Sequence, residues 1–203
     1  MAEQRVKSLG ADQLSLKFQL RCDVTLQNYL AGPNRPIVVA LEDFSQRMGW
    51  ECLFLWGEQG LGKSYLLQAT VNKVVSHGLA ACYFDLSDPE AMHPTMLEGL
   101  EQIDLIALDN IHAIAGCADW EEAIFDCYNR VHAAGKRLLI SANNPPNQLL
   151  IVLPDLISRL QAAIVFHIKP LNDKEKIALL QHMAQLRGLV LTEEVGTYLV
   201  NHY

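Results

Sequence analysis

Short runs of apolar residues alternate along most of this chain with longer segments in which apolar positions recur at helical spacing. The apolar runs, each four to six residues long, lie at 52–56, 80–84, 105–108, 137–140 and 163–168. Helical patterns lie between them, at 63–77, 89–100, 120–132 and 154–160. Near-continuous apolar strands separated by helices are typical of a parallel sheet that is covered on both faces. The pattern therefore predicts the α/β class, as a three-layer sandwich around a five-stranded parallel sheet.

The two ends of the chain lack this alternation. Residues 1–24 are polar and show no sustained period, so we expect a flexible leader there. Residues 25–170 carry the alternating pattern and are expected to form the core. Residues 171–203 show only helical patterns, and we expect them to form a helical appendage to that core.

The helical appendage begins with a capping signal. Asn172, followed three residues later by Glu175, has the spacing of a capping box. A second helical pattern opens at Thr192 and still continues at Tyr203, where the sequence shows no C-cap signal. We therefore expect the appendage to be incomplete, either because more sequence follows or because its last segment needs a partner.

Composition and charge narrow the class of protein. Of the 203 residues, 50% are apolar and 19% are charged, which excludes a disordered or collagen-like chain. The formal net charge is −7, from 16 basic and 23 acidic residues, whereas DNA-binding domains are usually basic. The longest apolar stretches, such as 37–41 and 149–153, have about five residues, and a membrane span needs about 20. Together with five cysteines in no CxxC pair, these features predict a soluble cytoplasmic protein.

A glycine-rich loop follows the apolar run 52–56 and opens the helical pattern at 63–77. Its sequence, GEQGLGKS, matches the phosphate-binding pattern GxxxxGK[ST] without departure. The glycines let backbone N–H groups point at phosphate oxygens, and the helix presents its positive N-terminus to the anion. Lys63 is expected to reach the β- and γ-phosphates, and the Ser64 hydroxyl to bind Mg²⁺. We therefore predict ADP or ATP with Mg²⁺ as the cofactor, held by Gly57, Glu58, Gln59, Gly60, Leu61, Gly62, Lys63 and Ser64.

Two polar residues follow the apolar run 105–108. Asp109 stands where a P-loop protein places the carboxylate that holds Mg²⁺ through water, although a strand-end aspartate without that role is the alternative. Asn110 stands where an active ATPase of this type carries a second carboxylate to polarise the attacking water. Because an amide cannot accept that proton, we expect intrinsic ATP hydrolysis to be slow.

Several segments resemble, in order, the ATPase domain of the bacterial replication initiator family DnaA. TLQNYLAGPN, which begins at Thr25, is similar to the family's segment on the adenine side of the nucleotide, and this resemblance places Tyr29 and Leu30 in the nucleotide site. FLWGEQGLGKSYLLQA, LDNIHAIAG, IFDCYNRVHAAGKRLLISANNPP and LPDLISRL resemble the boxes that follow. The resemblance covers about residues 13–203 and implies an AAA+ nucleotide-binding core followed by a helical lid.

Within this family the chain most resembles the regulators known as Hda. Asp109 is followed by an amide, LPDLISRL is similar to the arginine-bearing box of these regulators, and QLSLKF in the leader is similar to a motif that binds the DNA polymerase sliding clamp. The resemblance implies that Gln13, Leu14, Leu16 and Phe18 contact the clamp. A polar anchor followed by apolar anchors suits recognition of an extended peptide. The alternative for this segment is an edge strand that packs on the core.

The resemblance also implies roles for two later residues. Asn143 falls at the sensor-1 position, where a polar side chain contacts the γ-phosphate or the attacking water. Arg159 falls at the arginine finger, which reaches the nucleotide of a neighbouring protein and raises the rate of phosphoryl transfer by roughly 10³–10⁵-fold. A salt bridge on the helix surface is the alternative for Arg159. The sensor-2 arginine of the family's lid has no visible counterpart before Tyr203.

Three functions are consistent with these features. The first is a nucleotide-bound adaptor that joins the clamp to DnaA, reaches DNA only through the clamp, and inhibits re-initiation by stimulating hydrolysis of DnaA-bound ATP. The second is a self-contained ATPase such as a helicase-loader-like motor, which the complete P-loop favours and Asn110 disfavours. The third is a DNA-binding initiator paralogue, which the net charge of −7 and the lack of a helix-turn-helix disfavour. The adaptor is the hypothesis that the motifs favour, and the sequence leaves self-association open.

Overall fold

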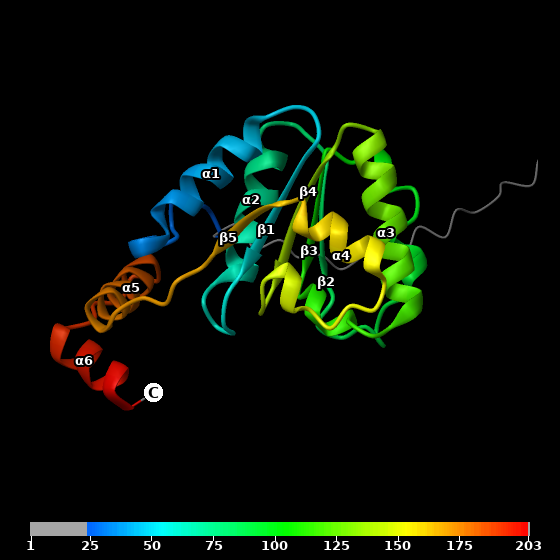
Figure 1. Ribbon diagram of the computed structural model, residues 1–203. Helices are drawn as coiled ribbons and strands as arrows, with labels where there is room; N and C mark the ends of the chain where they lie inside the picture. Colours follow the sequence, from blue (N-terminus) through cyan, green and yellow to red (C-terminus); the bar gives the residue numbers. More distant parts are fainter. Residues whose placement is uncertain (1–23, 203) are drawn as a thin grey trace, which may run out of the picture.

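Five parallel strands form the centre of the computed structural model, which describes residues 24–202 (Figure 1). Their order across the sheet is β2-β3-β4-β1-β5, and every neighbouring pair is parallel. The strands are β1 (Glu51–Trp56), β2 (Ala81–Asp85), β3 (Leu105–Asp109), β4 (Arg137–Ala142) and β5 (Ile164–His167). The predicted fold class is confirmed.

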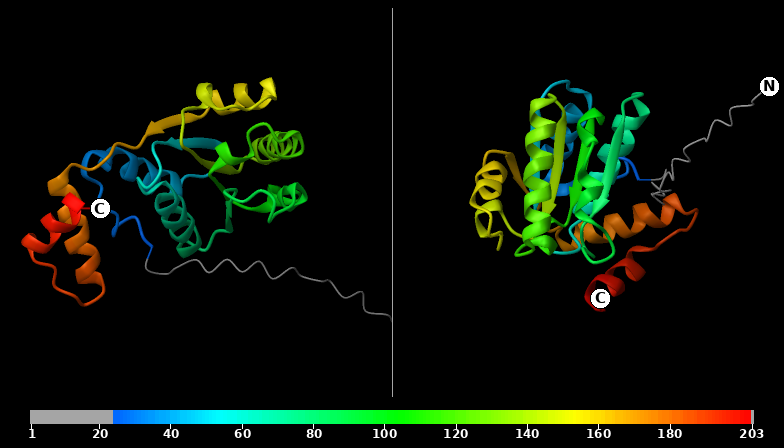
Figure 2. Two further views of the ribbon diagram at one scale, coloured as in Figure 1. Left: turned by 90° about the horizontal axis from the view of Figure 1, so that it is seen from below. Right: turned by 90° about the vertical axis from the view of Figure 1, so that its right-hand side faces the viewer.

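Helices cover both faces of this sheet and extend beyond it at one end. In residues 24–202 the α-helices are α1 (Arg35–Gln46), α2 (Lys63–Ser76), α3 (Ala118–Ala133), α4 (Pro154–Gln161), α5 (Asp173–Leu186) and α6 (Glu193–His202). Helices α1 and α2 pack on one face, and α3 and α4 pack on the other. Figure 2 shows that α5 and α6 stand apart from the sheet. No helix in this part of the chain is both long enough and apolar enough to span a membrane.

Successive residues of each central strand face opposite layers, and this alternation builds two hydrophobic cores. In β1, Phe54 packs beneath α3 and α4, whereas Leu53 and Leu55 pack beneath α1 and α2. In β3, Ile106 faces the side of α3 and α4, and Ala107 faces the side of α1 and α2. Each of these side chains is at most 2% exposed. A strand that is buried on both faces needs an apolar residue at every position, which is why these strands are near-continuous apolar runs in the sequence.

The helix predicted over 89–100 is wrong. Only two short 3-10 turns form there, η2 (Pro94–Leu97) and η3 (Leu100–Gln102). A proline lacks the backbone N–H that a helix interior needs, and it drives the preceding residue into an extended conformation. His93 accordingly has φ −117° and ψ 138°, and Gly99 breaks the segment again with a φ of 70°.

Helix α1 was not among the predicted helices. Pro36 lies in its first turn, where the missing N–H group would have had no partner within the helix. Ile37, Leu41 and Phe44 recur at helical spacing, and each is at most 5% exposed. The helical spacing was not recognised in the sequence because residues 37–41 form an uninterrupted apolar stretch. The spacing becomes visible only when Phe44 is included.

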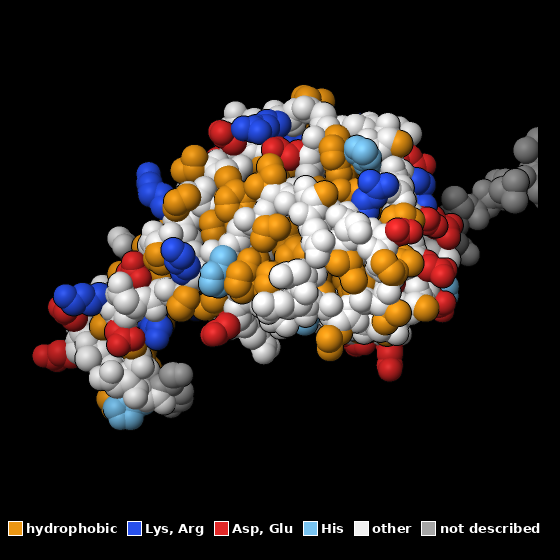
Figure 3. Space-filling model, in the orientation of Figure 1, with side chains coloured by type: hydrophobic (Ala, Val, Ile, Leu, Met, Phe, Trp, Pro, Cys, Tyr) orange, Lys and Arg blue, Asp and Glu red, His pale blue; other side chains and the backbone are white. Residues whose placement is uncertain are grey.

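Strand β5 forms an edge of the sheet and is its least covered strand. Ile164 is 49% exposed and Val165 is 40% exposed, so the expectation of strands covered on both faces is wrong for β5. Figure 3 shows hydrophobic side chains gathered on the face of the molecule that carries this strand.

The chain passes from β5 to α5 through a fixed junction. The buried side chain of Asn34 donates from Nδ2 to the Lys169 carbonyl at 2.9 Å and accepts the Lys169 N–H at Oδ1 at 2.8 Å. Helix α5 then begins with the predicted capping box, in which Asn172 and Glu175 exchange side-chain-to-backbone hydrogen bonds. Helices α5 and α6 pack against each other. Their assignment to a separate lid, and the division of the chain into three parts, stay predictions.

Candidate nucleotide pocket and the arginine on helix α4

The glycine-rich loop joins β1 to α2 at the carboxyl edge of the sheet. Gly60 and Gly62 have φ values of 83° and 86°, a region that residues with a Cβ atom rarely adopt. A Cβ on Gly62 would in addition lie 3.0 Å from the ring of Tyr29. The conformation of the loop therefore depends on glycine at these two positions.

Lys63 is the first residue of α2 and is only 5% exposed. Its ammonium group donates to the backbone carbonyls of Gly57 at 2.7 Å and Glu58 at 2.8 Å. Burial lowers the pKa of Lys63, and the negative charge of Asp109 opposes that shift. A phosphate at this point would give the buried ammonium a charged acceptor, and such hydrogen bonds are stronger than those to neutral carbonyls.

A pocket of about 470 Å³ opens beside the loop. Its lining combines the glycine-rich loop with the segments that follow β2, β3 and β4: Gln59, Gly60, Gly62, Lys63, Ser64, Ser87, Asn110, His112, Ala113 and Asn143. Ligands of open parallel sheets bind at this carboxyl edge. The structure thus brings together the P-loop residues, Asn110 and Asn143, which are far apart in the sequence.

Tyr29 lies against the glycine-rich loop. Its hydroxyl donates to the Leu61 carbonyl at 3.4 Å, and its ring centre is 5.8 Å from that of Tyr65. Burial raises the pKa of Tyr29, so the phenol is neutral. Leu30, which follows in the chain, is half-buried. The segment that begins at Thr25, which was predicted to contact the adenine, therefore lies beside the loop that was predicted to bind the phosphates.

The Asp109 carboxylate at the end of β3 is completely buried and held by three donors. Oδ2 accepts from the Tyr83 hydroxyl at 2.7 Å. Oδ1 accepts from the Ser141 hydroxyl and from the Asn110 N–H at 3.1 Å. Neither Tyr83 nor Ser141 was predicted from the sequence; they lie on the neighbouring strands β2 and β4. These contacts fix the orientation of the carboxylate behind the wall of the pocket.

Asn110 adopts the left-handed backbone conformation, with a φ of 59°, which asparagine tolerates better than most residues. Its Nδ2 donates to the Asp85 carboxylate at 2.8 Å. An amide therefore occupies the place where an active ATPase of this type is expected to carry a carboxylate. A carboxylate in this position would face a second carboxylate at hydrogen-bond distance.

His112 is a pocket residue that was not predicted from the sequence. The Asn143 Nδ2 lies 2.7 Å from the His112 Nε2, and because an amide N–H donates, that ring nitrogen accepts. Burial lowers the pKa of His112, the charge of Lys63 lowers it further, and Asp109 opposes the shift. His112 is therefore neutral at pH 7. The only signal for it in the sequence was a polar residue three positions after Asp109 in an otherwise apolar segment.

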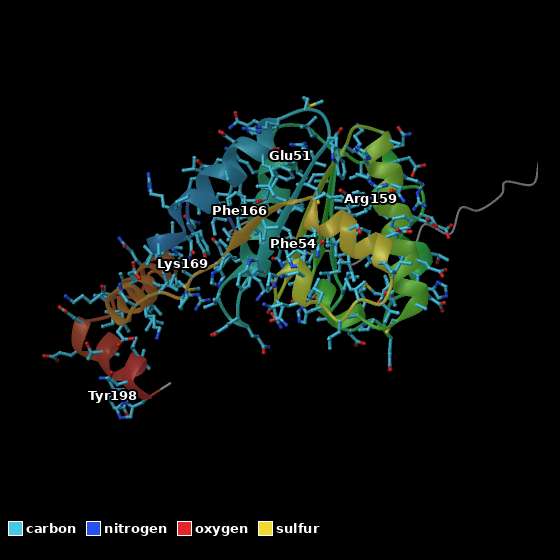
Figure 4. All side chains as sticks on the ribbon, viewed as in Figure 1. Glu51, Phe54, Arg159, Phe166, Lys169 and Tyr198 are labelled. Carbon is cyan, nitrogen blue, oxygen red and sulfur yellow. The ribbon has the colours of Figure 1, made fainter. Side chains whose placement is uncertain are left out.

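Arg159 lies near the end of α4 and is exposed (Figure 4). Its guanidinium carbon lies 5.8 Å from the centre of the Tyr128 ring, within the range of a cation–π contact. No carboxylate in residues 24–202 forms a salt bridge with it, and it is not among the residues that line the pocket. The surface salt bridge considered for Arg159 thus finds no partner in the described part of the chain.

Comparison with known protein families matches residues 20–167 to the model of the bacterial DnaA ATPase domain. The chain belongs to this DnaA family. The match includes every pocket residue and Arg159, and it ends at the last residue of β5. The predicted clamp-binding residues Gln13, Leu14, Leu16 and Phe18 precede it and lie outside the described residues.

Solved structures with the same fold include two DnaA proteins. DnaA from Aquifex aeolicus bound to AMPPCP is 24% identical, with a TM-score of 0.78, and the match covers 91% of this chain and 62% of that one. Domain III of Thermotoga maritima DnaA is 23% identical, with a TM-score of 0.76, and the match covers 88% and 80%. The DnaC helicase loader is 16% identical, with a TM-score of 0.59, and the match covers 72% and 97%. This chain thus spans less than two thirds of the Aquifex protein, and identities this low establish the shared fold alone.

Proposed function

We propose that this chain is a regulatory adaptor of the Hda kind. It binds an adenine nucleotide in its own pocket, docks on the sliding clamp through residues 13–18, and presents Arg159 to ATP bound by DnaA. Hydrolysis of that ATP inactivates the initiator and inhibits re-initiation of DNA replication. The observation that carries the proposal is the exposed Arg159, which lies outside its own chain's pocket and has no salt-bridge partner in residues 24–202.

The pocket fits an adenine nucleotide. The loop from Gly57 to Ser64 offers backbone N–H groups and the buried ammonium of Lys63. Tyr29 lies against this loop, which supports the expectation that Tyr29 and Leu30 contact the base. DnaA from Aquifex aeolicus, which shares the fold, binds the adenine nucleotide analogue AMPPCP. We assign ADP as the resident form, because a permanently bound product is consistent with an adaptor that does not turn over ATP.

The residues also fit Mg²⁺, which when bound would neutralise phosphate charge. Ser64 lines the pocket and would contact the ion directly. Asp109 already accepts three hydrogen bonds behind the pocket wall, so its contact would run through water. Mg²⁺ retains several of its waters in most protein sites, so an indirect carboxylate suits it.

A self-contained ATPase is the second candidate, and the complete glycine-rich loop favours it. A motor needs repeated hydrolysis, which in turn needs a base for the attacking water. Asn110 cannot serve as that base, because its side chain is an amide. Its Nδ2 group already donates a hydrogen bond to the Asp85 carboxylate. For this reason we place the adaptor first.

The test of the proposal follows conversion of labelled ATP on DnaA to ADP. DnaA carrying the label is mixed with DNA-loaded clamp, with and without this protein. We expect rapid conversion only in the complete mixture, because the proposed finger acts in trans. Equal conversion without this protein would refute the adaptor, and fast ATP turnover by this protein alone would place the ATPase candidate first.

A separate test addresses the clamp. Replacing Gln13, Leu16 and Phe18 with alanine should abolish binding to immobilised clamp while leaving thermal stabilisation by ADP unchanged, because the two sites lie on different segments. The matched control replaces Gln4 and Val6, which lie in the same leader outside the motif. Unchanged clamp binding by the triple variant would show that residues 13–18 are not the docking motif.

A further inference from the structure

Glu121 in the first turn of α3 is a buried carboxylate that binds backbone N–H groups. It is 2% exposed. Oε1 accepts from Gly116 at 2.7 Å and from Val152 at 3.1 Å. Oε2 accepts from Val152 at 2.9 Å and from Leu153 at 2.7 Å. Within residues 24–202 no basic side chain forms a salt bridge with it, so its charge is compensated by oriented backbone dipoles.

The segment that Glu121 holds packs on the core through alternate side chains only. Along 149–152 the side chains alternate between buried and open: Leu149 is 7% exposed, Leu150 84%, Ile151 6% and Val152 75%. The Val152 side chain thus contributes little packing, while its N–H points inward to the carboxylate. Glu121 therefore fixes the backbone of this segment at Val152 and Leu153, the last two residues before α4.

Helix α4 begins at the end of that segment and depends on the same carboxylate. Leu153 is its N-cap residue, and no side chain of the adjacent sequence caps the helix. The helix has eight residues, a length that is not stable by itself in water. Glu121 supplies the missing acceptor at its start and places a negative charge at its N-terminus, where a helix dipole favours one.

The same helix α3 also contacts the other end of α4. Tyr128 is seven residues after Glu121, two turns along the same face of α3. Its ring meets the guanidinium of Arg159. Leu156 and Leu160 are completely buried and set the rotation of α4 about its axis. Glu121 adds a restraint on the position of the helix along that axis, because it holds the backbone N–H groups of Val152 and Leu153 at its start.

We propose that Glu121 is a positioning residue for Arg159. By holding the start of α4 from 31 residues away, it sets where the guanidinium stands on the surface. The inference rests on the proposed function, because it concerns the precision with which Arg159 reaches a nucleotide on DnaA. A displacement of about 1 Å in a catalytic group lowers a rate by about 10²-fold, so a small shift of α4 is sufficient to matter.

The test uses Glu121→Gln in the full chain. The amide keeps the shape of the side chain but turns an NH₂ group toward a backbone N–H, so one anchor is lost. We expect the maximal rate of ATP hydrolysis on DnaA to fall about 10- to 100-fold. The concentration of this protein that gives half-maximal stimulation should change by less than about threefold, since the docking surfaces are intact. The matched control is Glu122→Gln, a change in the exposed neighbouring carboxylate that should leave both values unchanged.

Amide hydrogen exchange provides a second readout that needs no DnaA. The N–H groups of Val152 and Leu153 should exchange faster in Glu121→Gln than in wild type, while stabilisation by ADP stays the same. Should this variant fail to fold, Glu121→Asp gives the same test, because it keeps the charge and withdraws the oxygens by one methylene. Wild-type maximal stimulation by a folded Gln or Asp variant would overturn the inference, as would equal losses in stimulation and ADP binding. Failure of the wild-type protein to stimulate DnaA would instead overturn the proposed function itself.

Discussion

Two positively charged residues of this molecule stand in opposite surroundings. Lys63 is 5% exposed and lies between the carbonyls of its own loop, whereas Arg159 is exposed and rests on the face of Tyr128. A cation that the chain encloses can serve only a ligand in the same chain. A cation on the surface can serve a ligand that another protein carries.

The two sites also differ in how the chain builds them. The loop that encloses the Lys63 ammonium consists of eight consecutive residues whose glycines set the backbone, so this part of the site is specified locally. Arg159 depends on Glu121 and Tyr128, which hold α4 from another helix. Local construction suits a ligand that is always the same, whereas long-range construction leaves the arginine accessible and sensitive to changes elsewhere in the fold.

The largest effect that separates the two sites should come from Arg159→Ala. Stimulated hydrolysis of DnaA-bound ATP should fall by about 10³-fold or more, because a finger stabilises charge that develops in the transition state. Binding of ADP to this protein should not change. The measurements are conversion of labelled ATP on DnaA and thermal stabilisation by ADP–Mg.

Two further variants sharpen this result. Arg159→Lys should recover little of the rate, because a point charge lacks the planar fork that bonds two phosphate oxygens. Arg187→Ala removes an exposed arginine at the end of α5 and should leave the rate unchanged. Wild-type stimulation by Arg159→Ala would break the assignment of the trans role.

Lys63→Ala should instead reduce the binding of ADP to this protein. Affinity for ADP should fall by about 10²-fold, since a hydrogen bond to a charged group contributes about 1.5–3 kcal/mol and this ammonium would make more than one. The readout is the rise in Tm with millimolar ADP–Mg, which follows ligand affinity. Lys73→Ala, near the end of the same helix, should keep the full rise. An equal rise in all three proteins would contradict the location of the phosphate site.

The part of the site that the sequence predicted follows from one local motif and from residues at the ends of parallel strands. The glycine-rich loop, Asn110 and Asn143 do line one pocket, because each follows a strand and the carboxyl ends of parallel strands share an edge. His112 was missed because a single polar residue in an apolar segment gives no indication of its partner. Glu121 was missed because its partners, the N–H groups of Val152 and Leu153, are backbone groups that leave no signature in side-chain chemistry.

The fold shows the same division. Strands that are buried on both faces were predicted because every position must be apolar, and the capping box of α5 was predicted because it needs only Asn172 and Glu175. The exposure of β5 could not be predicted, since it follows from the strand's place at the edge of the sheet. The error at 89–100 came from giving apolar spacing more weight than Pro94, which local chemistry alone should have corrected.

A smaller effect should come from the residue that follows Asp109. Intrinsic ATP turnover should be below about one per second, the lower end of the ordinary enzyme range, because Asn110 is no base. Asn110→Asp alone should raise it little, since the new carboxylate would face Asp85 at hydrogen-bond distance and one of the two would retain a proton. The double change Asp85→Asn and Asn110→Asp should raise turnover by about tenfold or more.

Asp85→Asn alone is the control for this pair and should not increase turnover. The measurement is phosphate release by the purified protein without DnaA. A large gain from Asn110→Asp alone would show that Asp85 does not restrain the new carboxylate. Wild-type turnover well above one per second would contradict the prediction that the pocket binds a nucleotide without hydrolysing it rapidly.

The smallest effect concerns His112. Burial and the charge of Lys63 hold the pKa of this histidine below 6.5. As pH falls through 6.5, His112 in the unfolded chain takes up a proton before the buried ring does, so this residue makes the protein less stable until the folded pKa is reached. The folded ring resists protonation because its Nε2 accepts from Asn143 and would lose that bond.

His112→Gln keeps an acceptor for Asn143 but does not titrate. The fall in Tm between pH 7.5 and 5.5 should therefore be larger for wild type than for this variant, by no more than a few degrees. All other titrating groups are common to the two proteins and cancel in the comparison. An equal fall in both would mean that His112 is freely protonated in the pocket, and the neutral His112–Asn143 pair would then be wrong.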